Sequence, residues 1–133
     1  MLSAQETEFL NKEVQRMLLM KAIRETTDPR VVTSSIYTVP KKDSNKRRPV
    51  INLRWVNSHL KTQKFKMTTM KDVKAAITAN CWMTKMDLTD CFWGLPVHED
   101  DQRFLAFRWQ GKTYQFTCLP FGLAPSPMYI TKL

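Results

Sequence analysis

Asp87 is the residue whose sequence surroundings best suit chemistry. It lies near the end of segment 82–88, in which one set of alternate positions is mainly apolar, as in a half-buried strand. That period places Asp87 on the face opposite the packed one. Thr89 and Asp90 then break the pattern with residues that favour turns and helix starts. A carboxylate at a strand end, before a turn with free backbone amides, can hold a divalent cation against a phosphate. The alternative is that Asp87 is a plain strand-end aspartate and that Asp90 caps a helix.

Five cations surround a predicted hairpin. Residues 31–39 predict a strand or strand pair that Pro40 ends, residues 49–54 predict the returning strand, and Asp-Ser-Asn at 43–45 is typical of the turn between them. The cations at its tip and shoulders are Lys41, Lys42, Lys46, Arg47 and Arg48. Like charges this close repel one another unless an anion lies between them, so the hairpin suits a phosphate-rich ligand. A solvated charged turn is the alternative.

The overall charge also indicates a polyanionic partner. The chain of 133 residues has 21 Lys and Arg against 12 Asp and Glu, a net charge of +9, and nucleic acid is the leading candidate partner. Segment 58–69 is polar and interleaves Lys61, Lys64 and Lys66 with Phe65, a pattern that follows a nucleic-acid backbone or simply connects two elements. Arg54 is a further candidate contact for nucleic acid.

Cysteine usage and hydropathy exclude several classes of protein. Three widely spaced cysteines and two histidines provide neither a disulfide framework nor paired zinc ligands, so we expect reduced thiols. No apolar run approaches the roughly 18 residues that cross a bilayer, and the start does not read as a signal peptide. We therefore expect an intracellular protein, cytoplasmic or nuclear, with no membrane partner.

The remaining patterns predict an α+β domain. An amphipathic helix is expected over residues 3–26, with Ser3 and Glu6 as a capping box, either as a lid over a sheet or as a partner surface. A short helix is expected over residues 70–79, with Asn80 as its cap.

The last third of the sequence predicts a hairpin, a loop and the start of a helix. Strands at 104–109 and 112–119 flank a Gln-Gly turn, and a compact loop follows at 120–123. Ser126 is expected to cap a helix with Pro127 at its first position. Because the chain stops when the apolar face of that helix has only begun, we expect a fragment of a larger domain.

Four ordered stretches of the chain resemble the reverse transcriptase family. They are Val-Pro-Lys-Lys-Asp-Ser at 39–44 with Arg-Pro-Val-Ile-Asn-Leu-Arg-Trp-Val-Asn at 48–57, Met-Asp-Leu-Thr-Asp-Cys-Phe at 86–92, Tyr-Gln-Phe-Thr-Cys-Leu-Pro-Phe-Gly-Leu at 114–123, and the following Ala-Pro-Ser-Pro. The resemblance covers about residues 17–133. The sequence Leu-Pro-Phe-Gly-Leu at 119–123 looks more like that of long-terminal-repeat and DIRS-like retroelements than like that of group II intron enzymes.

The resemblance implies the fold class of a right-hand polymerase. It implies that residues of about 1–62 and 95–125 form fingers, and that about 63–94 and 126–133 form the first part of a palm. The parts expected to be missing are the rest of the palm, the thumb and any ribonuclease H domain. The implied function is RNA-directed DNA polymerisation, with an RNA or DNA template–primer and dNTPs as partners.

The resemblance also implies residues that hold a metal ion and the triphosphate. Asp87 would be a catalytic, metal-binding aspartate, and the backbone carbonyl of Leu88 would be a second ligand. Lys41 and Arg48 would neutralise the triphosphate of the incoming dNTP. The cofactor implied is Mg²⁺ or Mn²⁺ in a two-metal site, whose ions activate the primer 3′-hydroxyl and stabilise the leaving pyrophosphate.

Five further residues are implied around the nucleotide. Asp90 and Cys91 would offer backbone amides to the triphosphate. Phe92 would lie under the sugar and reject a 2′-hydroxyl sterically, although a core aromatic is the alternative there. Phe121 and Gly122 would border the nucleotide pocket.

The sequence departs from the family in its carboxylates. The family supplies further metal ligands from an aromatic-x-Asp-Asp hairpin, and nothing here follows Leu133. We reject Asp100-Asp101 as that pair, because it precedes the Pro-Phe-Gly loop and has no flanking apolar strands. We therefore expect the isolated chain to be inactive in polymerisation. The competing hypothesis is a catalytically dead remnant that binds nucleic acid or protein. A third possibility is a small metal-dependent nuclease, but the sequence lacks the cluster of carboxylates and histidines that such an enzyme would need.

Overall fold

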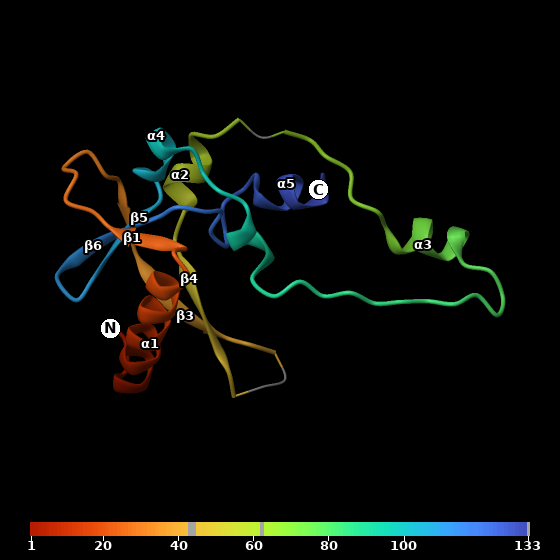
Figure 1. Cartoon of the computed structure of the whole chain (residues 1–133), viewed down its shortest axis with the longest axis horizontal. Helices are drawn as coiled ribbons and strands as arrows, with labels where there is room; N and C mark the ends of the chain where they lie inside the picture. Colours follow the sequence, from red (N-terminus) through yellow and green to blue (C-terminus); the bar gives the residue numbers. More distant parts are fainter. Residues whose placement is uncertain (43–44, 62, 133) are drawn as a thin grey trace.

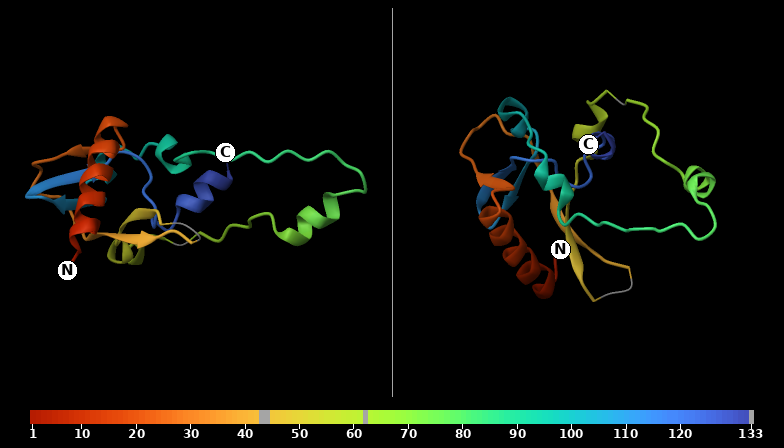
Figure 2. Two further views of the ribbon diagram at one scale, coloured as in Figure 1. Left: turned by 90° about the horizontal axis from the view of Figure 1, so that it is seen from below. Right: turned by 45° about the vertical axis from the view of Figure 1, so that its right-hand side comes forward.

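The structure, a computed structural model, describes residues 1–42, 45–61 and 63–132. It has two parts that differ in packing: a body of helices around two small sheets, and a long arm that leaves the body and returns to it (Figures 1 and 2). The mixed helix and strand content confirms the predicted α+β class. Of the described helices, none combines the length and apolar content that crossing a membrane requires.

Helix α1 (Ala4–Leu19) has the predicted capping box. The Ser3 amide donates to Glu6 Oε2 at 2.8 Å, and the Glu6 amide donates to Ser3 Oγ at 3.2 Å. The predicted extension of the helix to residue 26 is wrong. The chain reverses at Lys21, whose φ is +58°, because Ile23 is needed in strand β1 (Ile23–Glu25) opposite Phe116.

A four-stranded sheet has the order β1–β6–β5–β2. The predicted hairpin of β5 (Ala106–Trp109) and β6 (Lys112–Phe116) is confirmed, with Gln110 and Gly111 both at positive φ as a two-residue hairpin turn requires. Both strands are shorter than predicted. Strand β2 (Thr33–Ser34) pairs with β5 in parallel at the edge of the sheet.

The basic hairpin forms a second, two-stranded sheet. Strands β3 (Ile36–Pro40) and β4 (Arg47–Ile51) pair in antiparallel register, with Val39 opposite Arg48. The predicted Asp-Ser-Asn turn lies partly outside the described residues, which omit 43 and 44. The second strand ends before residue 54 because the Asn52 side chain accepts a hydrogen bond from the Arg54 amide at 3.3 Å, where helix α2 (Arg54–Ser58) begins.

The core of the body lies between α1, the four-stranded sheet and the base of the basic hairpin. Helix α1 packs against β1, β3 and β4. Its apolar stripe is fully buried, with exposed fractions of 0 to 2% for Leu10, Val14 and Met17. Phe107 of β5 is also fully buried, and its ring contacts those of Tyr114 and Phe116. Helix α1 is therefore the predicted lid, held by burial of its apolar face.

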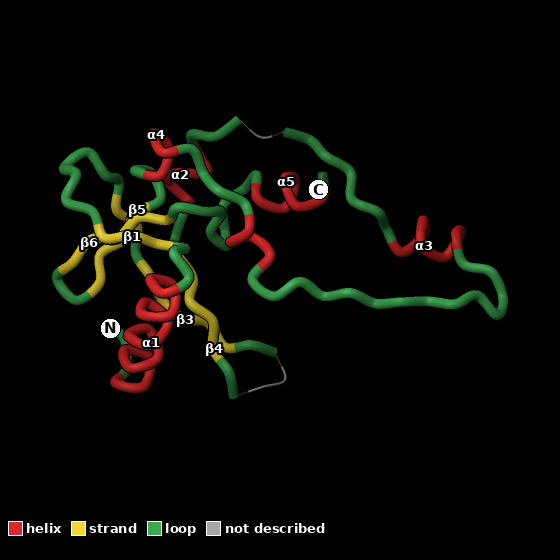
Figure 3. The backbone as a smooth tube through the Cα atoms, viewed as in Figure 1, coloured by secondary structure: helices red, strands yellow, loops and turns green. Residues whose placement is uncertain are grey.

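The arm comprises residues 63–88, all of which are exposed. Helix α3 (Met70–Ala76) lies at its far end, with a capping box between Thr69 and Asp72, and the rest of the arm is irregular (Figure 3). The predicted helix is confirmed, but it ends at Ala76 and its C-cap is Ile77 rather than Asn80.

The predicted strand at 82–88 is wrong for this structure. Its supposed packed face is open, since Trp82 is 101% exposed and Met86 is 85% exposed. A strand requires a neighbour for its backbone hydrogen bonds. Within the described part of the chain, no strand pairs with this segment.

Three short helices complete the body. A 3₁₀ turn, η1 (Cys91–Gly94), returns the arm to the body, and α4 (Glu99–Gln102) forms the predicted charged turn. Helix α5 (Ser126–Thr131) is confirmed, but its N-cap is Pro125 rather than Ser126. Ser126 is instead buried, and its hydroxyl donates to the Pro120 carbonyl at 3.4 Å.

Candidate functional site

The turn that follows Asp87 has a defined geometry. Asp90 lies in the left-handed region, with φ 51° and ψ 38°, a conformation that aspartate tolerates better than most residues. Its carbonyl accepts from the Trp93 amide at 2.9 Å, which starts η1. The predicted turn at Thr89 and Asp90 is therefore confirmed.

The Asp90 side chain binds helix α1 rather than capping η1. Its carboxylate accepts a hydrogen bond from the Arg16 guanidinium, and η1 has no side-chain cap. The same guanidinium lies 4.9 Å from the ring centroid of Trp93 and 3.4 Å from a carboxylate oxygen of Glu13. The alternative of Asp90 as a simple helix cap is therefore wrong. The sequence analysis missed Arg16, since no local pattern joins residues 74 positions apart.

Phe92 and Phe121 form an aromatic pair at the surface. Their ring centroids are 4.9 Å apart with an interplanar angle of 84°, the edge-to-face arrangement that aromatic pairs favour. Phe92 is half-buried and Phe121 is 43% exposed. The structure therefore brings together two of the residues predicted to border a nucleotide, and it leaves one edge of the pair open to solvent.

Asn57 holds the loop that presents Phe121. Its Nδ2 donates to the Gly122 carbonyl at 2.9 Å, and its Oδ1 accepts from the Ala124 amide at 2.8 Å. Gly122 has φ +92°, which favours glycine, and a Cβ there would lie 3.6 Å from the Ile51 carbonyl oxygen. Asn57 ends the stretch at 48–57 that resembles the family, but no sequence pattern predicted a role for it.

The cations of the basic hairpin face two different ways. Side chains alternate along a strand, and Arg47 and Arg48 are neighbours on β4, so they lie on opposite faces. Arg47 donates to Glu6 Oε1 of α1 at 2.5 Å and to Thr38 Oγ1 at 2.8 Å. Arg48 is exposed on the other face, as is Lys41 beyond the end of β3.

The expectation that all five cations await an anionic ligand is therefore wrong for Arg47. Glu6 neutralises it within the chain. The pKa of Glu6 is lowered, first by the hydrogen bond from the Ser3 amide and also by the charge of Arg47, so this carboxylate is ionised at neutral pH.

Asp87 and Leu88 lie at the returning end of the arm, and both are exposed. Among the described residues, no ion pair or hydrogen bond joins Asp87 to the basic hairpin. An exposed carboxylate is a suitable ligand for Mg²⁺, which protein sites bind through one or two carboxylates together with substrate phosphates. Asp90 is a poor second ligand because its carboxylate is held by Arg16. The described residues contain no group of three or more His, Cys, Asp or Glu that could hold a metal ion, so Asp87 would need ligands from elsewhere to bind one.

The weaker nucleic-acid candidates lie along one exposed path. Arg54 starts α2, and Lys61, Lys64 and Lys66 follow where the chain leaves the body for the arm. Residues 59–61 and 63–69 belong to no helix or strand, whereas Ser58 is the last residue of α2. Their contact with nucleic acid stays a prediction.

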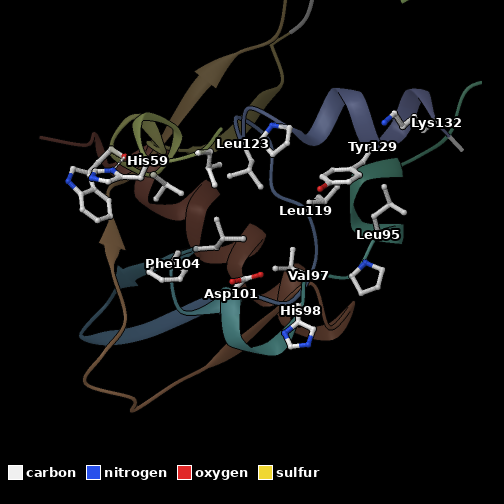
Figure 4. Close-up of a pocket in the computed structure, with 16 residues that line it drawn as sticks. His59, Leu95, Val97, His98, Asp101, Phe104, Leu119, Leu123, Tyr129 and Lys132 are labelled. Carbon is white, nitrogen blue, oxygen red and sulfur yellow. Dashed lines mark hydrogen bonds between the residues drawn. The ribbon is translucent and has the colours of Figure 1, made fainter. Parts of the chain in front are cut away.

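An apolar groove of about 810 Å³, which no sequence pattern predicted, lies beside the loop that Asn57 holds. Figure 4 shows side chains from α2, α4, α5 and the strand-like segment after η1 that converge on it. Tyr129 is 50% exposed and Trp55 is 55% exposed at its borders. Its titratable members besides Tyr129 lie among apolar side chains and are His59, His98, Asp101 and Lys132.

Comparison with known proteins identifies the family. Residues 39–133 match the family described as reverse transcriptase (RNA-dependent DNA polymerase). Because this match covers most of the chain, the chain belongs to the reverse transcriptase family, as its motifs predicted.

The relatives are retroviral and retrotransposon proteins. The Pro-Pol polyprotein of simian foamy virus type 1 is 33% identical over 100 residues, which are 75% of this chain and 9% of that protein. The retrovirus-related Pol polyprotein from transposon 412 of Drosophila melanogaster is 27% identical over 127 residues, 92% of this chain and 10% of that protein. The chain thus spans about a tenth of the length of these curated relatives.

A solved structure confirms the fold. The foamy viral protease–reverse transcriptase, determined in complex with double-stranded DNA, superposes with a TM-score of 0.79 at 27% identity. The likeness covers 99% of this chain and 27% of that one. The predicted membership of a retrotransposon-type reverse transcriptase family is therefore confirmed.

Proposed function

We propose that this chain forms the fingers and the first part of the palm of an RNA-directed DNA polymerase, where it positions the incoming dNTP beside one metal-binding aspartate. The observation that carries the proposal is the short connection from Asp87 through the Asp90 turn to Phe92, whose ring packs on Phe121. A carboxylate and an open aromatic pair are thereby close in the chain, as a site for a nucleotide and its metal requires. Family membership and the match to a polymerase solved on double-stranded DNA support it.

The hairpin provides the charge for the triphosphate. Arg48 and Lys41 lie on the face that α1 does not use, and both are exposed. Guanidinium and ammonium groups bind phosphate oxygens through charge-assisted hydrogen bonds. The backbone amides of Asp90 and Cys91, at the start of η1, would contact the same phosphates.

Asp87 would hold Mg²⁺ or Mn²⁺ together with the Leu88 carbonyl. When bound, such an ion neutralises phosphate charge and lowers the pKa of the primer hydroxyl. Further carboxylates of a two-metal site would come from outside residues 1–133, so we expect the isolated chain to be inactive in polymerisation.

The aromatic pair would select the sugar. Phe92 presents a flat ring that its packing on Phe121 fixes in orientation. A ring directly below the ribose leaves no room for a 2′-hydroxyl, and this exclusion requires no hydrogen bond. Gly122 would let the loop backbone approach the nucleotide closely, since it has no Cβ.

The template–primer would follow the exposed basic path of Arg54, Lys61, Lys64 and Lys66. We assign residues of about 1–62 and 95–125 to the fingers, and about 63–94 and 126–133 to the palm. The remaining palm, a thumb and any ribonuclease H domain would complete the enzyme.

The test is Asp87→Asn in the full-length polymerase that contains this chain. We expect primer extension with Mg²⁺ to fall at least about a thousandfold, while nucleic-acid affinity and its dependence on salt stay unchanged. Asp100→Asn is the matched control, since it removes an exposed carboxylate from α4, and its activity should equal that of the parent.

Two outcomes would contradict the proposal. Full activity of the Asp87→Asn enzyme would show that this residue does not bind a catalytic metal ion. A full-length protein that binds nucleic acid but extends no primer would instead favour the competing hypothesis of a remnant that acts only as a binding module.

A further inference from the structure

Helix α1 contacts both halves of the candidate nucleotide site, although it lies outside the residues that match the family, 39–133. Near its start, Glu6 pairs with Arg47 close to the turn end of the basic hairpin. Near its end, Arg16 pairs with Asp90 in the turn before η1. Ten residues separate the two positions on α1, which corresponds to about 15 Å along the helix axis.

The helix is a rigid support for these two contacts. Leu10 and Val14 lie between the two contact positions, Met17 directly follows Arg16, and all three are buried in the core. A helix fixed in this way cannot shift one ion pair without straining the other. The hairpin and the Asp90 turn are therefore held at a set separation by one element.

Arg16 is the more specific of the two contacts. Its guanidinium pairs with the Asp90 carboxylate and lies over the Trp93 ring at 4.9 Å. Trp93 in turn lines a small cavity together with Met17 and Phe121. The Asp90 side chain is 20% exposed and the Arg16 side chain is 42% exposed, so solvent screens this pair in part.

The left-handed backbone of Asp90 indicates what its contact with Arg16 does. A non-glycine residue at φ 51° persists when its surroundings hold it there. The turn fixes the direction of the next two residues, and these carry a backbone amide and the Phe92 ring. Loss of the Arg16 contact would let the turn relax and move both groups.

We propose that Arg16 is a positioning residue for nucleotide selection, which holds the Asp90 turn at a fixed place relative to the basic hairpin. This inference rests on the function proposed above. Arg16 touches neither the nucleotide nor the metal in this scheme; it acts through Asp90 and Trp93.

The test is single-nucleotide incorporation by the full-length polymerase with Arg16→Gln. We expect KM for the dNTP to rise about tenfold, which corresponds to weaker contacts from the displaced turn, while kcat and template–primer affinity stay close to those of the parent. Discrimination against the ribonucleotide should fall severalfold, because Phe92 is less well placed. A substitution that only destabilises the fold would lower the active fraction and leave KM and discrimination unchanged.

Two further variants sharpen the test. Arg16→Lys keeps the charge but loses the planar group over Trp93, so its KM should be intermediate. Asp90→Asn should resemble Arg16→Gln, and the double variant should be no worse than either single one, because the two residues share one interaction.

The matched control is Lys12→Gln on the same helix. Lys12 pairs with Glu8 in the preceding turn, and both side chains are largely exposed. Its KM and discrimination should equal those of the parent.

Asp87→Asn in the same assay separates the two proposals. If Asp87→Asn abolishes incorporation and Arg16→Gln behaves as Lys12→Gln, the role of Arg16 is wrong and the proposed function stands. If Asp87→Asn incorporates as the parent does, or the parent does not incorporate at all, both are wrong.

Discussion

The arm and the body contain similar side chains in opposite surroundings. Trp82 and Met86 in the arm are almost fully exposed, whereas Phe107 and Met17 in the body are almost fully buried. The sequence pattern at 82–88 is as strand-like as that of β5, yet only β5 has neighbours on both sides, β6 and β2. The difference shows that alternation gives a segment the capacity to be a strand, and that a partner with free hydrogen-bonding groups is needed to make it one.

The largest expected contrast is in the free energy of unfolding. Phe107→Ala should lower it by about 3 to 5 kcal/mol, because it removes a fully buried ring from the core. Trp82→Ala, a larger truncation, should change it by less than about 0.5 kcal/mol, because the indole is exposed. Urea titration followed by circular dichroism measures both, and a large loss for Trp82→Ala would mean that the arm packs on the body in solution.

A second contrast is in thiol reactivity. Cys81 is exposed in the arm, whereas Cys118 is buried in the body, and burial raises the pKa of the Cys118 thiol to about 11. The two-unit rise from its ordinary value of 9.0 lowers the thiolate fraction near pH 8 about a hundredfold. Alkylation by iodoacetamide, mapped by mass spectrometry, should therefore modify Cys81 at least a hundred times faster. Equal rates would contradict the burial of Cys118.

The smallest contrast compares the two capping boxes. Ser3→Ala should lower the free energy of unfolding by about 1 kcal/mol, because α1 is part of the cooperative core. Thr69→Ala removes the same kind of cap from α3, whose residues are all exposed, so it should reduce only local helicity. Hydrogen exchange at the amides of α3 and α1 distinguishes the two effects, and a global loss for Thr69→Ala would contradict the separation of arm and body.

The local elements could be predicted because their signals are local. The Ser3 and Glu6 capping box, the Gln110-Gly111 turn and the basic hairpin each depend on residues close in sequence. Helix and strand ends were less predictable, since tertiary pairing decides them. Ile23 fits the helical period of α1, but it belongs to strand β1, where it pairs with Phe116.

One contact within the candidate site joins two residues that the motifs singled out, whereas its other connections were not predictable. The motifs singled out Phe92 and Phe121, and the structure places their rings in contact. The contacts of Arg16 and Asn57 cross 74 and 65 residues, and no spacing rule connects residues that far apart. Strand alternation, applied to Arg47 and Arg48, could have shown that the two face opposite sides.

The left-handed backbone at Asp90 limits which residues evolution can place there. Glycine would relieve the torsional cost but would leave the guanidinium of α1 without its anion. Asparagine would adopt the same backbone and keep a hydrogen bond while giving up the charge, and β-branched residues would satisfy neither requirement. A substitution at position 90 that removes the carboxylate should therefore be best tolerated together with a neutral residue at position 16, where the guanidinium would no longer need an anion.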